Sequence, residues 1–297
     1  MVSNAIPIIS HIDKALSKEI RRTRNDYYKE FQLSIRVSPD GFSFNILDRE
    51  RNRHLALISY LLQEIPDFEE LVKELQSIFK QHELLQRYYA STRILLETPK
   101  STLVPSALFE KSRVNDYLKF NHVINRREEA GYDQMNNLEA FNVYAVPVKL
   151  KEFFKSKFAR FKMLHYLSPL IDLLLLLTKN QPAADKMYMN VRNGVFDLIY
   201  IDKGKLIFAN SFSYRTPEDF VYFLLFSMEQ LQLNPEEVQL ILLGEIDKSS
   251  KLYEIIYRYI RHIDFIRRNE LFKYSYVFDE LPDWHFYNLL NLAQCEL

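Results

Sequence analysis

Alternating apolar and polar residues run from residue 31 to residue 60 and predict a set of β-strands. In Leu33-Ser34-Ile35-Arg36-Val37 every second side chain is apolar, and similar patterns cover residues 42–47 and 54–60. Pro39-Asp40-Gly41 is typical of the turn of a hairpin between the first two strands. From residue 66 the apolar spacing changes to i, i+3, i+4 and i+7, which predicts an amphipathic helix.

The same order of elements returns about 150 residues later and predicts an internal duplication. Residues 42–48 match residues 196–202, and further strands are expected at 186–191 and 206–212, before a helix with Thr216 as its N-cap. Each copy then continues with a strand and a helix, which are expected at 92–96 and 105–120 in the first copy and at 238–243 and 249–260 in the second. Hairpins followed by alternating strands and helices indicate an α/β protein with mixed sheets flanked by helices.

We expect three parts along the chain. Residues 1–30 are polar and weakly periodic and predict an N-terminal arm, residues 31–180 form a first lobe, and residues 181–297 form a second lobe that ends in a C-terminal helix after Trp284. The segment between the two copies predicts a polar loop, a strand, a helix and a strongly apolar helix, in that order, at 121–139, 141–146, 148–161 and 169–178.

Composition and charge exclude several classes of function. The chain has 297 residues with 39 Lys or Arg and 39 Asp or Glu, and this balance argues against a nucleic-acid partner. It has five glycines, and no two of them lie closer than ten residues, which excludes Gly-x-Gly phosphate-binding loops. Cys295 is the single cysteine, and no apolar run approaches the ~20 residues that span a bilayer. We therefore expect a cytoplasmic protein that does not insert into a membrane.

The doubled order of three strands, helix, strand and helix resembles the actin-like ATPase superfamily. Its two ribonuclease-H-like lobes close around a nucleotide. The resemblance covers residues 31–265, and its local motifs are Leu103-Val104-Pro105, Leu206-Ile207-Phe208 and Leu240-Ile241-Leu242-Leu243-Gly244. Within the superfamily the chain is similar to the pilus-assembly and cell-division ATPases, and to an uncharacterised bacterial family of unknown function with this fold.

The resemblance also implies where a nucleotide site would lie. In the superfamily an Asp at the end of strand one organises metal-bound water, and a Gly two residues later lets phosphate approach the backbone. Here Arg36 and Ser38 occupy those positions in the first lobe, and Asn190 and Arg192 occupy them in the second. The glycine pair that admits the adenosine is reduced to Gly244 followed by a glutamate.

These replacements predict a degenerate nucleotide site with no cofactor, because Mg²⁺ needs hard oxygen ligands or the waters that they hold. A shift of the first hairpin by four residues would instead place Asp40 at the acidic position. The alternative cofactor is ATP with magnesium. Arg36 and Arg192 either hold an anion such as a phosphate or carboxylate, or are outward strand and turn residues without a ligand.

Other candidate residues have competing interpretations. Asp48 and Asp202 occupy matching turns, and the missing carboxylate on strand one favours a turn role over a nuclease-type metal site. The seven histidines show no zinc-binding spacing. A basic cluster suggests contact with RNA, but helical spacing predicts that Tyr259 is buried with Leu252, Ile255 and Ile256, which favours an ordinary solvated face. The cluster consists of Arg258, Arg261, His262, Arg267 and Arg268.

From these observations we expect a non-catalytic binding or scaffold protein whose partner is another protein. Aromatic residues make up 14% of the chain, which is consistent either with a protein interface, including a homodimer, or with strand packing. The first alternative is an actin-like ATPase that binds nucleotide in an unconventional pocket. A second alternative is an RNA-linked accessory protein that uses the basic residues of the N-terminal arm and the cluster around Arg267.

Overall fold

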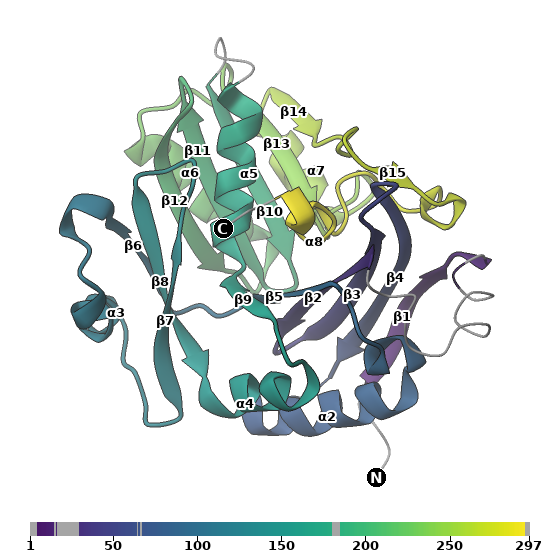
Figure 1. Ribbon diagram of the computed structural model, residues 1–297. Coiled ribbons are helices and arrows are strands. Elements are labelled where there is room, and N and C mark those ends of the chain that lie inside the picture. The colour runs from purple at the N-terminus through teal and green to yellow at the C-terminus, as the bar shows by residue number, and fades with distance from the viewer. Residues whose placement is uncertain are drawn as a thin grey trace. The chain divides into compact units, whose positions relative to one another are not determined.

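The computed structural model describes residues 5–14, 16, 30–63, 65, 67–179 and 185–294 (Figure 1). The chain forms two compact units. Unit 1 consists of Met1–Leu170 together with Asn269–Glu280 and Asn288–Leu297, and unit 2 consists of Ile171–Arg268 and Leu281–Tyr287. Each unit contains a mixed sheet and an apolar core of its own.

The main sheet of unit 1 has seven strands in the order β1-β4-β3-β2-β5-β9, and β15 pairs with β4. As predicted, β2, β3 and β4 are joined as antiparallel hairpins, while β5 and β9 run parallel to β2. The strands are β1 (Ala5–Ile12), β2 (Phe31–Ser38), β3 (Gly41–Asp48), β4 (Arg53–Leu62), β5 (Ser91–Leu96), β9 (Lys162–His165) and β15 (Lys273–Tyr274).

Helices α2 (Phe68–Gln81) and α4 (Val148–Lys157) cover one face of this sheet (Figure 1). The Asp67 side chain accepts hydrogen bonds from the first turn of α2, and Leu71 and Leu75 are buried as the apolar spacing predicted. Phe79 near the end of α2 packs against the rings of Phe153 and Phe154 on α4. These large side chains remove most apolar surface of the two helices from water, which is the main stabilising contribution of the layer.

A second sheet in unit 1 has three antiparallel strands in the order β6-β8-β7 and packs against α3 (Val114–Asn121). The strands are β6 (Ser101–Pro105), β7 (Glu128–Gln134) and β8 (Ala140–Pro147). The helix predicted at 105–120 starts only at Val114. The residues before it form two short 3₁₀ turns, η3 (Ser106–Leu108) and η4 (Lys111–Arg113). The predicted loop at 121–139 contains β7, whose polar sequence lacks the alternation that marks a strand.

The rest of unit 1 differs from the predictions mainly at element ends. The helix expected at 148–161 ends at Lys157, because β9 begins at Lys162. Helix α5 (Leu167–Lys179) matches the predicted apolar helix and continues from unit 1 into unit 2. The remaining short elements are η2 (Glu83–Gln86), η5 (Tyr276–Phe278), α8 (Tyr287–Asn291) and η6 (Leu292–Gln294).

Unit 2 contains a five-stranded sheet in the order β12-β11-β10-β13-β14. Helix α6 (Pro217–Gln230) begins with the predicted Thr216 cap, which forms a reciprocal capping box with Asp219. Helix α7 (Lys251–Tyr257) is shorter than expected, so Tyr259 lies beyond its end and is 49% exposed rather than buried. The strands are β10 (Lys186–Arg192), β11 (Val195–Asp202), β12 (Lys205–Ser213), β13 (Gln239–Gly244) and β14 (His262–Phe265).

The two sheets repeat the same topology, as the sequence duplication predicted. The order β4-β3-β2-β5-β9 in unit 1 corresponds to β12-β11-β10-β13-β14 in unit 2, with the same parallel and antiparallel pairings. The register shifts at Ile46/Leu47 in one copy and at Tyr200/Ile201 in the other. These two positions match in the sequence alignment of the copies, so the irregularity itself is duplicated.

The two units do not coincide with the predicted parts of the chain. Residues 5–12 of the predicted arm form β1, because they pair with β4 along its length, whereas most of 15–29 lies outside the described residues. Residues 269–280 and 288–297 of the predicted second lobe belong to unit 1. The pairing of β15 with β4 accounts for the first of these segments, and a hydrogen bond from Arg93 Nη1 to Leu292 O (2.7 Å) accounts in part for the second.

Within the described part of the chain, every helix is too short or too polar to cross a lipid bilayer.

Candidate functional site

In unit 1, the residue at the expected acidic position of the first hairpin forms a buried ion pair. The Nε of Arg36 on β2 donates to Glu97 Oε2 at 3.0 Å, and its guanidinium lies 5.7 Å from the ring centre of Tyr166. The residue is 9% exposed, so Arg36 is not the outward strand residue that one interpretation assumed. Separating these two buried side chains is unfavourable, because it would leave an uncompensated charge in a buried position.

Ser38 and Asp40 interact within the turn of the same hairpin. Ser38 is fully buried, and its Oγ donates to Asp40 Oδ1 at 2.7 Å and lies 3.1 Å from Gly41 O. The carboxylate of Asp40 is thus used to close the turn, which is a common role of Asp in such loops.

In unit 2, the two residues at the corresponding positions both bind one carboxylate that the sequence analysis did not single out. Asn190 Nδ2 donates to Asp197 Oδ2 at 2.8 Å, and Arg192 Nη2 donates to Asp197 Oδ1 at 2.5 Å. Ser211 Oγ donates to the same Oδ1 at 2.6 Å. Asp197 has no exposed surface, and its donors come from β10 and β12 on either side of β11.

The sequence did contain a signal for Asp197. It is an acidic residue inside the apolar strand Val195–Asp202, where a charge is buried only if it is paired and hydrogen-bonded. Its partners were harder to identify, because they depend on the register of three strands. The pairing of Asn190 with Asp197, and of Asp197 with Ser211, aligns the residues in one row across the sheet.

Gly244 is explained by the backbone of unit 2. Its φ is +89°, and a Cβ at this position would lie 2.1 Å from Val191 O and 2.9 Å from Asn190 Oδ1. The Gly244 N–H donates to Trp284 O at 2.9 Å. The close approach of β13 to β10 therefore requires glycine, and Gly244 lies beside Asn190, which together with Arg192 binds Asp197.

A second buried carboxylate, Asp133 on β7 in unit 1, was missed because its segment was predicted to be a loop. Its Oδ2 accepts hydrogen bonds from Ser168 Oγ at 2.7 Å and from the His165 backbone N–H at 2.8 Å. Asp133 has no ion pair in the described part of the chain. Burial raises the pKa of the Asp133 carboxyl to about 6, although these hydrogen bonds, the bond with Tyr144 and the charge of Lys162 oppose the increase.

The Tyr144 hydroxyl gives a geometric reason for a protonated Asp133. It lies 3.1 Å from both Asp133 Oδ1 and Met163 O, yet it has one proton to donate. When Asp133 is ionised, Tyr144 must divide that proton between two acceptors. When Asp133 is protonated, its own O–H donates to Tyr144, and Tyr144 donates to Met163 O.

The neighbouring His165 is held in one neutral tautomer. Its Nδ1 accepts from Asn142 Nδ2 at 3.0 Å and from the Leu167 N–H at 3.2 Å, so the ring proton lies on Nε2 and is donated to Thr98 O at 3.0 Å. His165 and Ser168 are both buried, so this hydrogen-bond network stabilises the fold and is not accessible to a substrate.

The remaining candidate residues have local roles. Asp48 Oδ1 accepts from the Arg51 N–H and Oδ2 from Arg51 Nη1, both at 3.0 Å, which agrees with the turn interpretation. A hydrogen bond shared with Asp202 raises the pKa of Asp185. Arg268 of the basic cluster forms an ion pair with Asp283 at 3.2 Å. Among the described residues, no group of three or more His, Cys, Asp or Glu has a geometry suited to a metal ion.

Comparisons with known proteins establish the fold. The profile of a family described as "Protein of unknown function (DUF3822)" matches residues 22–263. A crystal structure from Bacteroides thetaiotaomicron VPI-5482, described as a protein with actin-like ATPase fold and unknown function, is similar with a TM-score of 0.74. It is 24% identical in sequence, and the alignment covers 82% of this chain and 94% of that one.

The structure of a PilM–PilN type IV pilus biogenesis complex is similar with a TM-score of 0.57 and 10% identity, over 89% of this chain and 97% of that one. No curated protein matches the chain. These likenesses confirm the predicted fold class, an actin-like ATPase architecture in which two ribonuclease-H-like copies carry mixed sheets.

Proposed function

This chain belongs to the DUF3822 family of unknown function, and from its actin-like ATPase fold and the two first hairpins we propose that it is a non-catalytic binding or scaffold protein. Its partner in this proposal is another protein, or a second copy of the chain, in the bacterial cytoplasm. The PilM–PilN structure supports a partner-binding role, since it is a complex between a protein of this fold and another protein.

The observation that carries the proposal is the set of three hydrogen bonds that the buried Asp197 carboxylate accepts. In the superfamily an acidic side chain at this end of the sheet organises metal-bound water. In unit 2 both oxygens of the Asp197 carboxylate already accept hydrogen bonds, one of them from the Arg192 guanidinium. A magnesium ion would have to displace these donors and separate the buried Arg192 guanidinium from the Asp197 carboxylate, which is unfavourable. In unit 1 the corresponding position is itself a cation, Arg36, paired with Glu97.

Isothermal titration calorimetry with ATP and magnesium tests the proposal. We expect no heat of binding from the purified chain and no thermal shift. A nucleotide present at about a hundredfold its dissociation constant would stabilise the fold by about 2.7 kcal/mol, so a thermal-shift assay is a sensitive second readout. Micromolar binding of ATP with magnesium would overturn the non-catalytic proposal.

The second candidate function, a nucleotide-binding ATPase with an unconventional pocket, is favoured by one observation. Asp197 lies directly opposite Asn190, so the acidic group missing from β10 is present one strand away on β11. If this carboxylate supported hydrolysis, the wild-type chain would release phosphate from ATP and an Asp197→Asn variant would not. The non-catalytic proposal predicts no phosphate release from either protein.

A further inference from the structure

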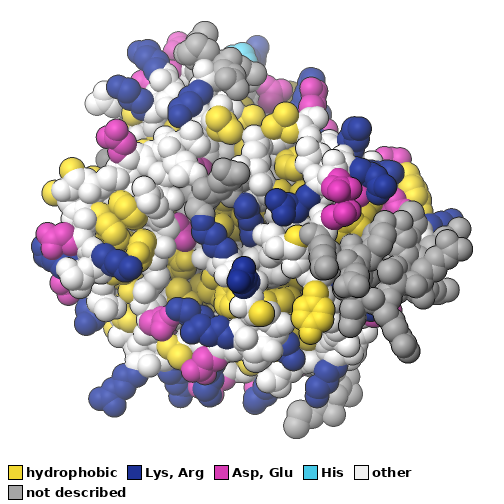
Figure 2. Space-filling view, in the orientation of Figure 1, with side chains coloured by type: hydrophobic (Ala, Val, Ile, Leu, Met, Phe, Trp, Pro, Cys, Tyr) yellow, Lys and Arg dark blue, Asp and Glu magenta, His cyan; other side chains and the backbone are white. Residues whose placement is uncertain are grey.

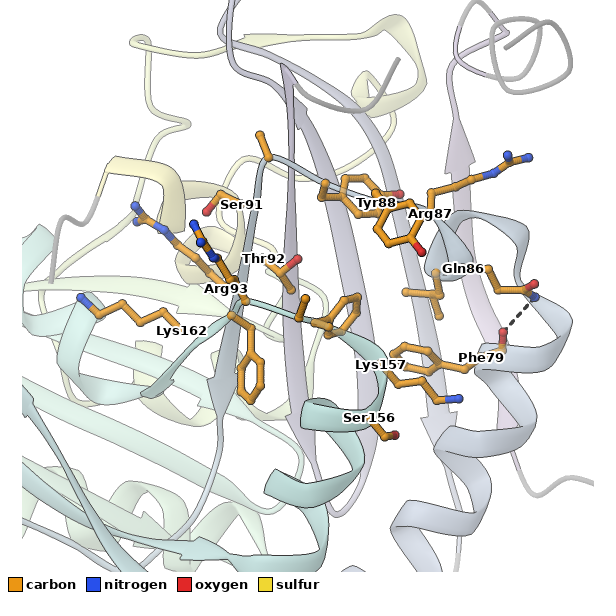
Figure 3. A pocket seen from close by; sticks show the side chains of 17 residues that line it. Phe79, Gln86, Arg87, Tyr88, Ser91, Thr92, Arg93, Ser156, Lys157 and Lys162 are labelled. Carbon is orange, nitrogen blue, oxygen red and sulfur yellow. Dashed lines mark hydrogen bonds between the residues drawn. The ribbon is translucent and has the colours of Figure 1, made fainter. Parts of the chain in front are cut away.

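Unit 1 contains a cavity whose lining includes no residue of either first hairpin. It has a volume of about 680 Å³ and is formed where the carboxyl ends of α2 and α4 meet the amino ends of β5 and β9. Figure 3 shows Arg93 and Lys162 extending from β5 and β9 on one side of the cavity, with Gln86 and Tyr88 on the other.

The charge of this cavity is strongly one-sided. Five cationic side chains line it, and no Asp or Glu does, although the whole chain has equal numbers of both signs. Figure 2 shows Lys and Arg side chains gathered over β5 and β9 with hydrophobic side chains beside them. The five cationic residues are Arg87, Arg93, Lys157, Arg160 and Lys162.

Three of these cations already have partners. Arg87 forms an ion pair with Glu83, and Arg93 donates to Leu292 O at 2.7 Å. The Lys157 Nζ lies 5.6 Å from the ring centre of Phe153, in the last turn of α4, where a cation also balances the helix dipole. Arg160 and Lys162 are exposed, and neither has an acidic partner within ion-pair distance in the described ranges. Both side chains are therefore open to a ligand, although the charge of Lys162 also acts on Asp133.

The cavity also exposes apolar surface next to these charges. Tyr88 is 74% exposed at the rim, and the rings of Phe158 and Phe161 line the wall. A ligand that fits this surface carries several negative charges separated by apolar or aromatic groups. Segments of partner proteins with acidic and hydrophobic residues in alternation have this chemistry.

The geometry favours separate carboxylates over one phosphate group. Phosphate sites commonly combine Arg or Lys side chains with backbone N–H groups at glycine-rich turns or helix amino ends. No glycine lines this cavity, and both helices present their carboxyl ends, with Gln86 Nε2 donating to the carbonyls of Phe79 and Lys80. The cations also come from several elements, namely the segment before β5, β5 itself, α4 and the segment that leads into and begins β9, which suits charges distributed along a peptide.

We propose that this cavity in unit 1 is a docking site for an acidic–hydrophobic peptide segment of a partner protein. The inference rests on the proposed binding function and specifies the chemistry of the partner. The neutral net charge of the chain argues against an extended nucleic acid as the occupant, since such ligands are attracted by a broad basic surface.

The test measures fluorescence anisotropy of a labelled peptide in which Asp and Glu alternate with Leu and Phe. A matched peptide replaces Asp and Glu with Asn and Gln. We expect the wild-type chain to bind the acidic peptide at least about tenfold more tightly than the amide peptide, with affinity that falls as salt increases. The variant Arg160→Glu/Lys162→Glu should weaken binding by about tenfold or more.

The control variant Lys111→Glu/Lys119→Glu changes the net charge equally at exposed positions beside and on α3, and it should alter affinity by less than about twofold. Circular dichroism and thermal melts confirm that both variants fold. Equal binding of the two peptides, equal effects of the two variants, or tighter binding of labelled oligouridylate would overturn the proposal. ATP with magnesium is titrated into the same proteins, and heat that persists in Arg160→Glu/Lys162→Glu would count against the non-catalytic function and not against this docking site.

Discussion

Each unit buries an aspartate that accepts hydrogen bonds from three groups, but the two aspartates differ in the charge of those groups. Asp197 in unit 2 binds the Arg192 guanidinium in addition to Asn190 and Ser211. The three groups that donate to Asp133 in unit 1 are all neutral. The number of hydrogen bonds is similar, so the main difference is the cationic group that donates directly to Asp197, whereas the charge of Lys162 acts on Asp133 without forming an ion pair. A buried carboxylate without such a partner is protonated more readily, as the raised pKa of Asp133 indicates.

The most severe test of this comparison removes the carboxylate that has the cationic partner. In an Asp197→Ala variant, Arg192 keeps its charge at 7% exposure and loses the Asp197 carboxylate. We expect the free energy of unfolding to fall by about 3–5 kcal/mol, the range for a buried pair broken on one side. Urea denaturation of the wild type and the variant measures the difference. A loss no larger than that of an ordinary surface mutation would mean that the pair does not stabilise unit 2.

The pH dependence of stability tests the other carboxylate. The pKa of Asp133 is raised from 3.8 to about 6 on folding, so the folded state binds the proton more tightly than the unfolded state. Its contribution is fully present below pH 4 and is lost as the pH rises through 6, by about 3 kcal/mol in total.

An Asp133→Asn variant should abolish this part of the pH dependence, because the amide can donate to Tyr144 and accept from Ser168 as the protonated acid does. Urea midpoints of both proteins between pH 4 and pH 8 provide the measurement. We expect the variant to match or exceed the wild type at pH 8. Parallel curves for the two proteins would show that Asp133 is ionised throughout.

Gly244 offers a smaller perturbation of the Asp197 group. In a Gly244→Ala variant the new methyl group would press on Val191 O and on Oδ1 of Asn190, whose Nδ2 donates to Asp197, and the positive φ would be strained. We expect a destabilisation of about 1–3 kcal/mol. Thermal unfolding with Gly204→Ala as the control separates the two causes, since a Cβ at Gly204 has the same sign of φ but meets nothing within 4 Å. Equal losses in both variants would assign the whole effect to φ.

The mildest test uses the position in unit 1 that matches Asp197. Ser43 shares a hydrogen bond with Ser59 at 2.8 Å, in the register that Asp197 and Ser211 occupy in unit 2. Ser43→Ala removes one neutral hydrogen bond and should cost about 1 kcal/mol in urea denaturation. If Ser43→Ala lowered the free energy of unfolding as much as Asp197→Ala does, the cationic partner of Asp197 would not be what distinguishes the two units.

Local chemistry was sufficient to predict the duplicated hairpins, because alternation and turn residues lie within a few positions of each other. It was insufficient for β7, where the backbone pairs with β8 although the residues are polar. The candidate positions Arg36, Ser38, Asn190, Arg192 and Gly244 were identified by resemblance, but their partners were not. Glu97 lies 61 residues from Arg36, and Asp197 faces Asn190 only after the hairpin register is known. Tertiary pairing decides such contacts, and periodicity does not encode it.

The hydrogen bonds around Asp133 also affect whether a strand of another chain can pair with the edge of the main sheet of unit 1. Strand β9 ends the sheet on one side, and a terminal strand normally exposes backbone groups that recruit another strand and promote aggregation. Here the Tyr144 hydroxyl contacts Met163 O and the Asp133 carboxyl accepts the His165 N–H, so those backbone groups are already satisfied. The hydrogen bonds made by Tyr144 and Asp133 thus protect the β9 edge of the sheet against the addition of a strand from another chain.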